Sequence, residues 1–200
     1  MLSDLHDRTA TYYFNLIDED GNGIIEASDF ALRAQRLATA QNVTDEGVRE
    51  TLRHQVVAWW DHICTIADFD GDARVTLPEW KAYGHAIQRG VGEGESMTLR
   101  TLQRAARGTL DAIDRTGSGR VTEEEYADWL DAWGAEGSAE AFQRLDRGGK
   151  GFLTKEDLVV AVQEFYLSDD PDAPGNALYG PLPENPSAGQ TGQLGGEISP

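Results

Sequence analysis

The chain has 200 residues, of which 35 are acidic and 17 are basic, and its formal net charge at pH 7 is −18. So acidic a chain lacks the basic footprint that nucleic acids and anionic membrane surfaces require, and it has no run of about 18 apolar residues that could span a bilayer. With 40% hydrophobic residues, a single cysteine and no signal-peptide pattern at its N-terminus, it is expected to form a cytoplasmic globular protein that contacts neither nucleic acid nor membranes.

Two acidic segments interrupt helical patterns in the N-terminal part of the chain. The first is DEDGNGIIEASD (18–29) and the second is DFDGDARVTLPE (68–79). Between them, apolar residues three and four positions apart run from Val48 to Ala67 and stripe one face of a predicted helix. Pro78 is compatible with the next predicted helix because it falls in the first turn.

Two similar segments follow in the C-terminal part, DRTGSGRVTEEE (114–125) and DRGGKGFLTKED (146–157). An apolar stripe from Leu99 to Ile113 predicts a helix before the first of them, and a further stripe follows the second. From Asp169 onward the chain is rich in Pro and Gly and has no basic residue, which indicates an irregular tail. The whole pattern predicts eight helices arranged as four helix–loop–helix units.

The four segments form an internal repeat whose spacing suits a metal ion. Each has twelve residues, begins with Asp, ends with Asp or Glu and carries an apolar residue at its eighth place. A hard divalent cation such as Ca²⁺ takes about six to eight oxygen ligands, and side chains at places 1, 3, 5 and 12 with the carbonyl at place 7 can supply most of them. Glycine at place 6 permits the sharp turn between them.

Over roughly residues 10–167 this repeat resembles the EF-hand family. The uneven loop spacing, the Asp that closes the first loop and the degenerate fourth loop are similar to sarcoplasmic calcium-binding proteins, in particular the bacterial, calerythrin-like members. The resemblance implies an all-α fold of four EF-hand motifs in two face-to-face pairs, followed by an irregular Pro- and Gly-rich C-terminal tail. We expect one pair in residues 1–90, a second in residues 97–167, and a tail, 168–200, that is partly docked or disordered.

The second loop has the strongest set of expected ligands. They are Asp68, Asp70, Asp72, the Arg74 carbonyl and Glu79. Ala73 stands where glycine is expected, and left-handed backbone there costs an L-residue on the order of 1 kcal/mol. Four carboxylates around one divalent ion are expected to outweigh that cost.

The first loop offers a somewhat different set. Its expected ligands are Asp18, Asp20, Asn22, the Ile24 carbonyl and Asp29. Aspartate at the last place is one methylene shorter than glutamate, so that bidentate contact with the ion is harder. Because a lower coordination number suits Mg²⁺, we expect this site to be less selective for Ca²⁺ and to accept Mg²⁺.

The last two loops are expected to differ in occupancy. The third offers Asp114, Thr116, Ser118, the Arg120 carbonyl and Glu125, and its two carboxylates predict weaker binding. The fourth has Gly148 and Lys150 at places 3 and 5, so a missing oxygen and an ammonium both oppose a cation. We therefore expect about three bound Ca²⁺ ions and a folded fourth loop without one.

An interpretation without metal explains part of this pattern. Thr76 with Glu79, and Thr122 with Glu125, also fit helix capping boxes. Capping does not account for the aspartates at places 1, 3 and 5 or for the apolar flanks. No specific Ser, His and Asp set and no phosphate-binding glycine loop stands out, so we expect no enzymatic activity.

The resemblance implies calcium buffering or transport rather than switching. The chain has two methionines, whereas a calmodulin-type sensor exposes a Met-rich groove to its target helices. We expect a monomeric intracellular Ca²⁺ buffer, with a sensor that regulates a target protein as the alternative and a photoprotein- or luciferin-binding-like protein as a minor alternative. The tail segment ALYGPL (177–182) is expected to fold back over apolar surface.

Overall fold

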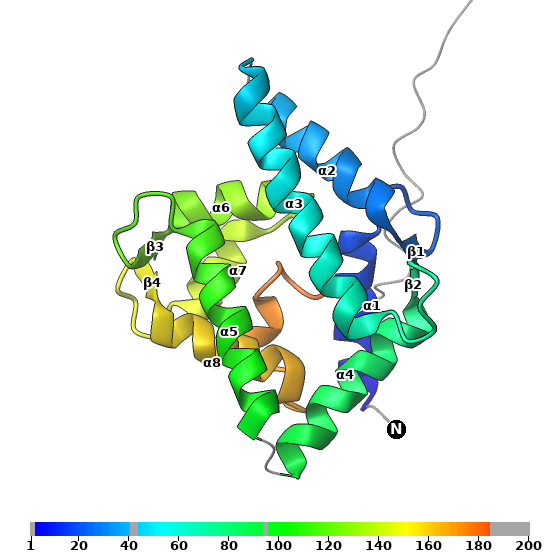
Figure 1. Ribbon diagram of the computed structural model, residues 1–200. Helices are drawn as coiled ribbons and strands as arrows, with labels where there is room; N and C mark the ends of the chain where they lie inside the picture. The colour runs from blue at the N-terminus through cyan, green and yellow to red at the C-terminus, as the bar shows by residue number, and fades with distance from the viewer. Residues whose placement is uncertain (1–2, 41–43, 94–95, 185–200) are drawn as a thin grey trace, which may run out of the picture.

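The computed structural model describes residues 3–40, 44–93 and 96–184. The helices of these ranges are α1 (Asp4–Ile17), α2 (Ala27–Ala40), α3 (Glu46–Ala67), α4 (Leu77–Gly92), α5 (Ser96–Ile113), α6 (Glu123–Ala132), α7 (Ser138–Leu145) and α8 (Lys155–Leu167) (Figure 1). The strands are β1 (Ile24–Ile25), β2 (Val75–Thr76), β3 (Arg120–Thr122) and β4 (Phe152–Thr154), and a 3-10 helix, η1 (Pro174–Ala177), lies in the tail. The predicted all-α fold class is confirmed. None of the described helices has the length and apolar character needed to cross a membrane.

Each twelve-residue segment forms the loop between two helices, and the loops meet in pairs. β1 is antiparallel to β2, with Ile25 opposite Val75, and β3 is antiparallel to β4, with Val121 opposite Leu153. These four side chains stand at the eighth place of their loops and are fully buried. Their burial fixes the register, because a shift by one residue would turn the apolar side chain outward. The two small sheets lie on opposite sides of the molecule in Figure 1.

An aromatic cluster joins the N-terminal half (α1–α4) to the C-terminal half (α5–α8). The ring of Tyr13 in α1 stacks on Tyr179 of the tail with centroids 4.0 Å apart. The same ring contacts Trp133, directly after α6, at 6.0 Å and Phe165 of α8 at 5.7 Å. Trp80 of α4 packs against it at 5.5 Å. All five side chains are buried, so the two halves share one core, which large aromatic surfaces stabilise.

The first part of the tail folds back into this core. Leu178 and Tyr179 are buried, as the sequence predicted for their segment. The hydroxyl of Tyr126 in α6 donates to two backbone carbonyls of the tail, each at 3.0 Å. Gly175 lies so close to α8 that an added Cβ would be 2.5 Å from a backbone carbonyl oxygen of that helix, so a larger residue does not fit there. Residues 185–200 lie outside the described part of the tail.

Candidate metal centres

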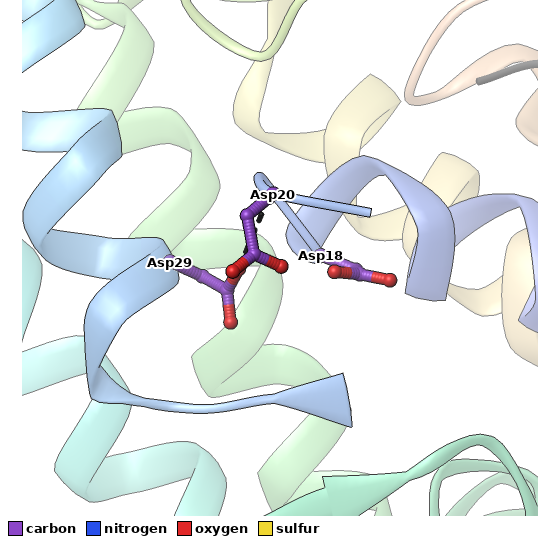
Figure 2. A group of neighbouring side chains, drawn as sticks. All are labelled: Asp18, Asp20 and Asp29. Atoms are coloured by element: carbon purple, nitrogen blue, oxygen red, sulfur yellow. Dashed lines mark hydrogen bonds between the residues drawn. The ribbon is translucent and has the colours of Figure 1, made fainter. Parts of the chain in front are cut away.

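The first loop directs three carboxylates toward one point. One oxygen each of Asp18, Asp20 and Asp29 lies within 4.8 Å of the others (Figure 2). Asp18 directly follows α1 and Asp29 lies in the first turn of α2; both are buried, whereas Asp20 is exposed. The Asn22 side-chain amide donates to Asp20 at 3.0 Å, and the Ile24 N–H donates to the Asn22 side-chain oxygen at 2.8 Å. The structure thus gathers places 1, 3, 5 and 12 around a single volume.

The second loop gathers three of its four predicted carboxylates. One oxygen each of Asp68, Asp70 and Glu79 lies within 4.8 Å of the others. The carboxylate of Asp72 is exposed and lies outside this group, although its backbone N–H donates to Asp70 at 3.2 Å. Arg74 directly precedes β2. Its exposed side chain pairs with Glu26 of the first loop and does not point into the second loop.

The third loop links all five of its expected ligand residues by hydrogen bonds. The backbone N–H of Thr116 donates to Glu125 at 3.3 Å, and the Thr116 hydroxyl donates to Asp114 at 3.1 Å. The Ser118 hydroxyl lies 2.9 Å from the carbonyl oxygen of Arg120. Only two of the five expected ligand residues carry a carboxylate, so the third loop has less negative charge than the first two.

The carboxylates at the two ends of each loop also hold its backbone. Each first-place aspartate accepts the N–H of place 6 at 2.7–3.0 Å: Asp18, Asp68, Asp114 and Asp146. Each last-place carboxylate accepts the N–H of place 9 at 2.7–3.0 Å: Asp29, Glu79, Glu125 and Asp157. The capping boxes expected at Thr76 and Thr122 are present. The carboxylates expected to bind a metal therefore also hold the loop backbone and cap the following helices.

Burial and hydrogen bonding affect these carboxylates in opposite directions. Burial raises the pKa of Asp18 and of Asp29 above the ordinary value, because low-dielectric surroundings disfavour the charged form. A hydrogen bond from the place-9 N–H lowers the pKa of Glu79 and of Glu125, because it stabilises the charged form. A divalent cation between Asp18 and Asp29 would offset the cost of burying them, so the first loop fits a hard cation such as Ca²⁺.

The fourth loop contains a cation of its own. The Lys150 ammonium at place 5 lies 2.5 Å from the last-place carboxylate of Asp157. Gly148 supplies no side-chain oxygen at place 3. The backbone nevertheless follows the pattern of the other loops, since Asp146 accepts the N–H of Lys150 and of Gly151. A protein ammonium thus pairs with the carboxylate that would otherwise close a metal site.

Sequence reasoning missed a charged cluster beside the first loop, formed by Glu19, Arg33 and Arg36. The Glu19 carboxylate pairs with Arg33 at 2.9 Å and with Arg36 at 2.7 Å. Arg33 is buried, which is unusual for a charged residue unless it is paired. The available signal was the spacing of Arg33 and Arg36 four and seven positions after Asp29, which places all three on one face of α2.

A small cavity lies between α1, α4 and α8. Its volume is about 20 Å³, and its lining includes His6, Tyr13, Trp80 and Tyr166. A cavity of this size holds about one water molecule. The Nε2 atom of His6 is buried there without a hydrogen-bond partner among the described residues, and burial lowers the pKa of this ring.

The comparisons with known proteins agree with this geometry. The family model described as EF hand matches residues 107–130, around the third loop. Calerythrin from Saccharopolyspora erythraea is 31% identical over 158 residues, which cover 77% of this chain and 88% of calerythrin.

Two solved structures extend the comparison. A Streptomyces coelicolor calcium-binding protein is 27% identical, with a TM-score of 0.56 and coverage of 82% of this chain and 99% of the other. The sarcoplasmic calcium-binding protein from amphioxus shares the fold at 18% identity, with a TM-score of 0.64. The match covers 92% of this chain and 100% of the amphioxus protein. The helix–loop–helix units, the converging carboxylates and the extended match to calerythrin show that this chain belongs to the calerythrin family of EF-hand calcium-binding proteins.

Proposed function

We propose that this calcium-binding protein is a monomeric intracellular Ca²⁺ buffer in which the first three loops each hold one ion. The observation that carries the proposal is the convergence of places 1, 3 and 12 within 4.8 Å in the first and second loops. Three oxygens at such separations, one from each of three carboxylates, suit a hard cation, which takes about six to eight oxygen ligands. The third loop has the same backbone geometry with fewer charges, and the fourth is proposed to hold no ion.

The burial of the large aromatic side chains supports a buffer rather than a sensor. A sensor must expose an apolar groove to its target when Ca²⁺ binds. Here Trp80, Tyr126 and Trp133 are buried in the shared core. Among the described residues, the large hydrophobic side chains that are exposed lie apart on α2, the second loop and α8: Leu32, Phe69 and Val160. Scattered single residues of this kind do not form a docking surface.

Calorimetric titration with Ca²⁺, in the presence and absence of Mg²⁺, tests the number of sites. We expect about three ions per chain, with Mg²⁺ weakening Ca²⁺ binding most at the first loop, where the shorter Asp29 is the last-place ligand. Glu79→Gln and Glu125→Gln should each remove one ion. Asp157→Asn in the fourth loop is the matched control and should leave the stoichiometry unchanged. Saturation at four ions, or loss of an ion in the control, would contradict the assignment.

A sensor function is the second candidate, because the Streptomyces coelicolor relative is described in connection with prokaryotic calcium-mediated regulation. The two functions differ in the apolar surface that Ca²⁺ exposes. A buffer should bind an environment-sensitive apolar dye equally weakly with Ca²⁺ and with chelator. Strong dye fluorescence that appears only with Ca²⁺ would favour the sensor and overturn the buffer.

A photoprotein-like function finds no support in the cavity between α1, α4 and α8. The cavity between α1, α4 and α8 measures about 20 Å³, whereas sites for small organic molecules commonly measure about 300–1,000 Å³. Tyr13 and Trp80 fill the space around it. We therefore do not propose that this cavity holds a luciferin-type ligand.

A further inference from the structure

One face of α2 carries both a predicted metal ligand and two arginines. Asp29 closes the first loop, and Arg33 and Arg36 follow it four and seven positions later. Residues at this spacing lie on the same side of a helix, one turn above another. Any rotation of α2 that moves Asp29 therefore moves both guanidinium groups with it.

The arginines are tied to the first loop through Glu19. The Glu19 carboxylate pairs with Arg33 at 2.9 Å and with Arg36 at 2.7 Å, and its side chain is 10% exposed. The backbone N–H of the same residue donates to Asp29 Oδ1 at 2.9 Å. Arg33 also donates to the carbonyl of Leu16 at the end of α1. The cluster thus clamps the end of α1, the loop and α2 in one arrangement.

The same arginines contact the C-terminal half. The Arg33 guanidinium lies over the ring of Trp133, 4.3 Å from its centroid. Arg36 donates to the carbonyl of Ala132, the last residue of α6, at 3.1 Å. Trp133 in turn packs against Trp59 of α3 with centroids 4.7 Å apart. The contacts of Arg33 and Arg36 join residues about a hundred positions apart in the chain.

We propose that the cluster of Glu19, Arg33 and Arg36 couples ion binding in the first loop to the packing of α2 against α6. The inference rests on the proposed function, because it takes the first loop to hold an ion. A bound ion fixes Asp29 and hence the orientation of α2, which keeps Arg33 on Trp133 and Arg36 on Ala132. By thermodynamic reciprocity, the contact between the halves must strengthen ion binding in the first loop by the same factor.

Because the pair of Arg33 and Glu19 is buried, partial loss of its contacts is unfavourable. The Arg33 side chain is 4% exposed, and Glu19 is its ion-pair partner within the described structure. A buried guanidinium that loses its carboxylate is left with an uncompensated charge, which is strongly unfavourable. The buried pair of Glu19 with Arg33 is therefore expected to form or break as a unit, whereas the more exposed Arg36 can be replaced separately.

The test is Arg36→Gln, because the Arg36 side chain is 45% exposed and its loss leaves the core intact. The Gly23 N–H donates to Asp18 at 2.8 Å and the Gly119 N–H to Asp114 at 2.7 Å. The NMR resonances of these two amides therefore report the occupancy of the first and third loops separately in a Ca²⁺ titration. We expect first-loop affinity to fall by about five-fold or more, the lower end of typical coupling between sites, with third-loop affinity unchanged.

The sign of the effect separates coupling from simple charge. Removing a positive charge near a cation site relieves Coulomb repulsion and, by charge alone, strengthens cation binding. An increase in first-loop affinity would therefore overturn the proposal. Arg53→Gln is the matched control, because Arg53 makes an exposed ion pair with Glu50 at 2.7 Å on α3 and takes no part in the cluster. An equal loss of affinity in this control would also overturn the coupling.

A second measurement tests the reverse direction. Asp29→Asn disables the first loop, and with the other loops saturated it should speed hydrogen exchange of the Trp133 amide relative to wild type. Asp157→Asn, in the fourth loop, should leave the hydrogen-exchange rate of the Trp133 amide unchanged. If Gly23 in the wild type fails to respond to Ca²⁺, the proposed first site is wrong. If Gly23 responds but Arg36→Gln binds as the wild type does, the coupling alone is wrong.

Discussion

The backbone of the second loop contains a strained position that can be relieved by one substitution. Ala73 has a φ of 60° and is the non-glycine residue with positive φ in the described ranges. It stands at place 6, where Gly23 and Gly119 have φ values of 84° and 75° in their loops. The Ala73 N–H donates to Asp68 at 3.0 Å, which holds the turn in this conformation. Ala73→Gly should therefore stabilise the folded protein.

The expected gain follows from two opposing terms. Left-handed backbone costs an L-residue about 1–2 kcal/mol, whereas the freedom of glycine in the unfolded chain costs about 0.4–1 kcal/mol. The difference ranges from about 0 to 1.6 kcal/mol, and the midpoints of the two terms give a gain of about 0.8 kcal/mol. For a chain of this size 1 kcal/mol raises the melting temperature by roughly 2–4 °C. Because Ala73 is exposed, no packing contact complicates the comparison.

Urea and thermal unfolding, each with Ca²⁺ and with chelator, measure this gain. Gly119→Ala is the reverse control, since an added Cβ at that glycine meets no atom within 4 Å and the change tests backbone strain alone. It should lower the free energy of unfolding by a similar amount, about 0.8 kcal/mol. If Ala73→Gly is neutral or destabilising while Gly119→Ala is destabilising, strain at Ala73 is not the explanation.

Three further changes address the sites and the core. Glu79→Gln should weaken the second site by at least about ten-fold, as for loss of a charged ligand, and Trp80 fluorescence should then respond less to Ca²⁺; an unchanged titration would contradict the ligand assignment. Lys150→Met should lower the free energy of unfolding in chelator by about 0.5–1 kcal/mol, because its ion pair with Asp157 is partly exposed, while calorimetry still counts the same number of ions. Burial lowers the pKa of His6 below 6.5, so the folded state favours the neutral ring, and the stability it confers is lost as the pH falls below 6.5 through the lower pKa of the folded state. Urea unfolding between pH 7.5 and 5.5 in saturating Ca²⁺ should show this loss, and His6→Gln should remove it.

The convergence of the loop carboxylates could be predicted because each loop is a local structure. Each segment of twelve residues contains the carboxylates, the sharp turn and the apolar eighth place, and the same spacing occurs four times in the sequence. The structure still differs in one respect, since Asp72 lies outside the group formed by Asp68, Asp70 and Glu79. The Asp72 side chain at place 5 is exposed, so packing within the loop does not fix its position.

The packing of the two halves could not be predicted in the same way. Nothing in the pattern around Asp29 indicates that Arg33 lies on Trp133, because the two residues belong to helices with independent periodicities. The apolar residues of the tail indicated that it docks, but not that Tyr179 stacks on Tyr13 in the centre of the core.

By itself, therefore, the sequence determined the helical fold class and the EF-hand character of the chain, and it predicted which loop residues bind a cation. These properties depend on contacts within a dozen residues. Only the tertiary structure decided that Asp18 and Asp29 are buried, that Glu19 pairs with two arginines of α2, and that these reach the other half. Such contacts depend on how the helices pack, which many residues distant in the chain determine together.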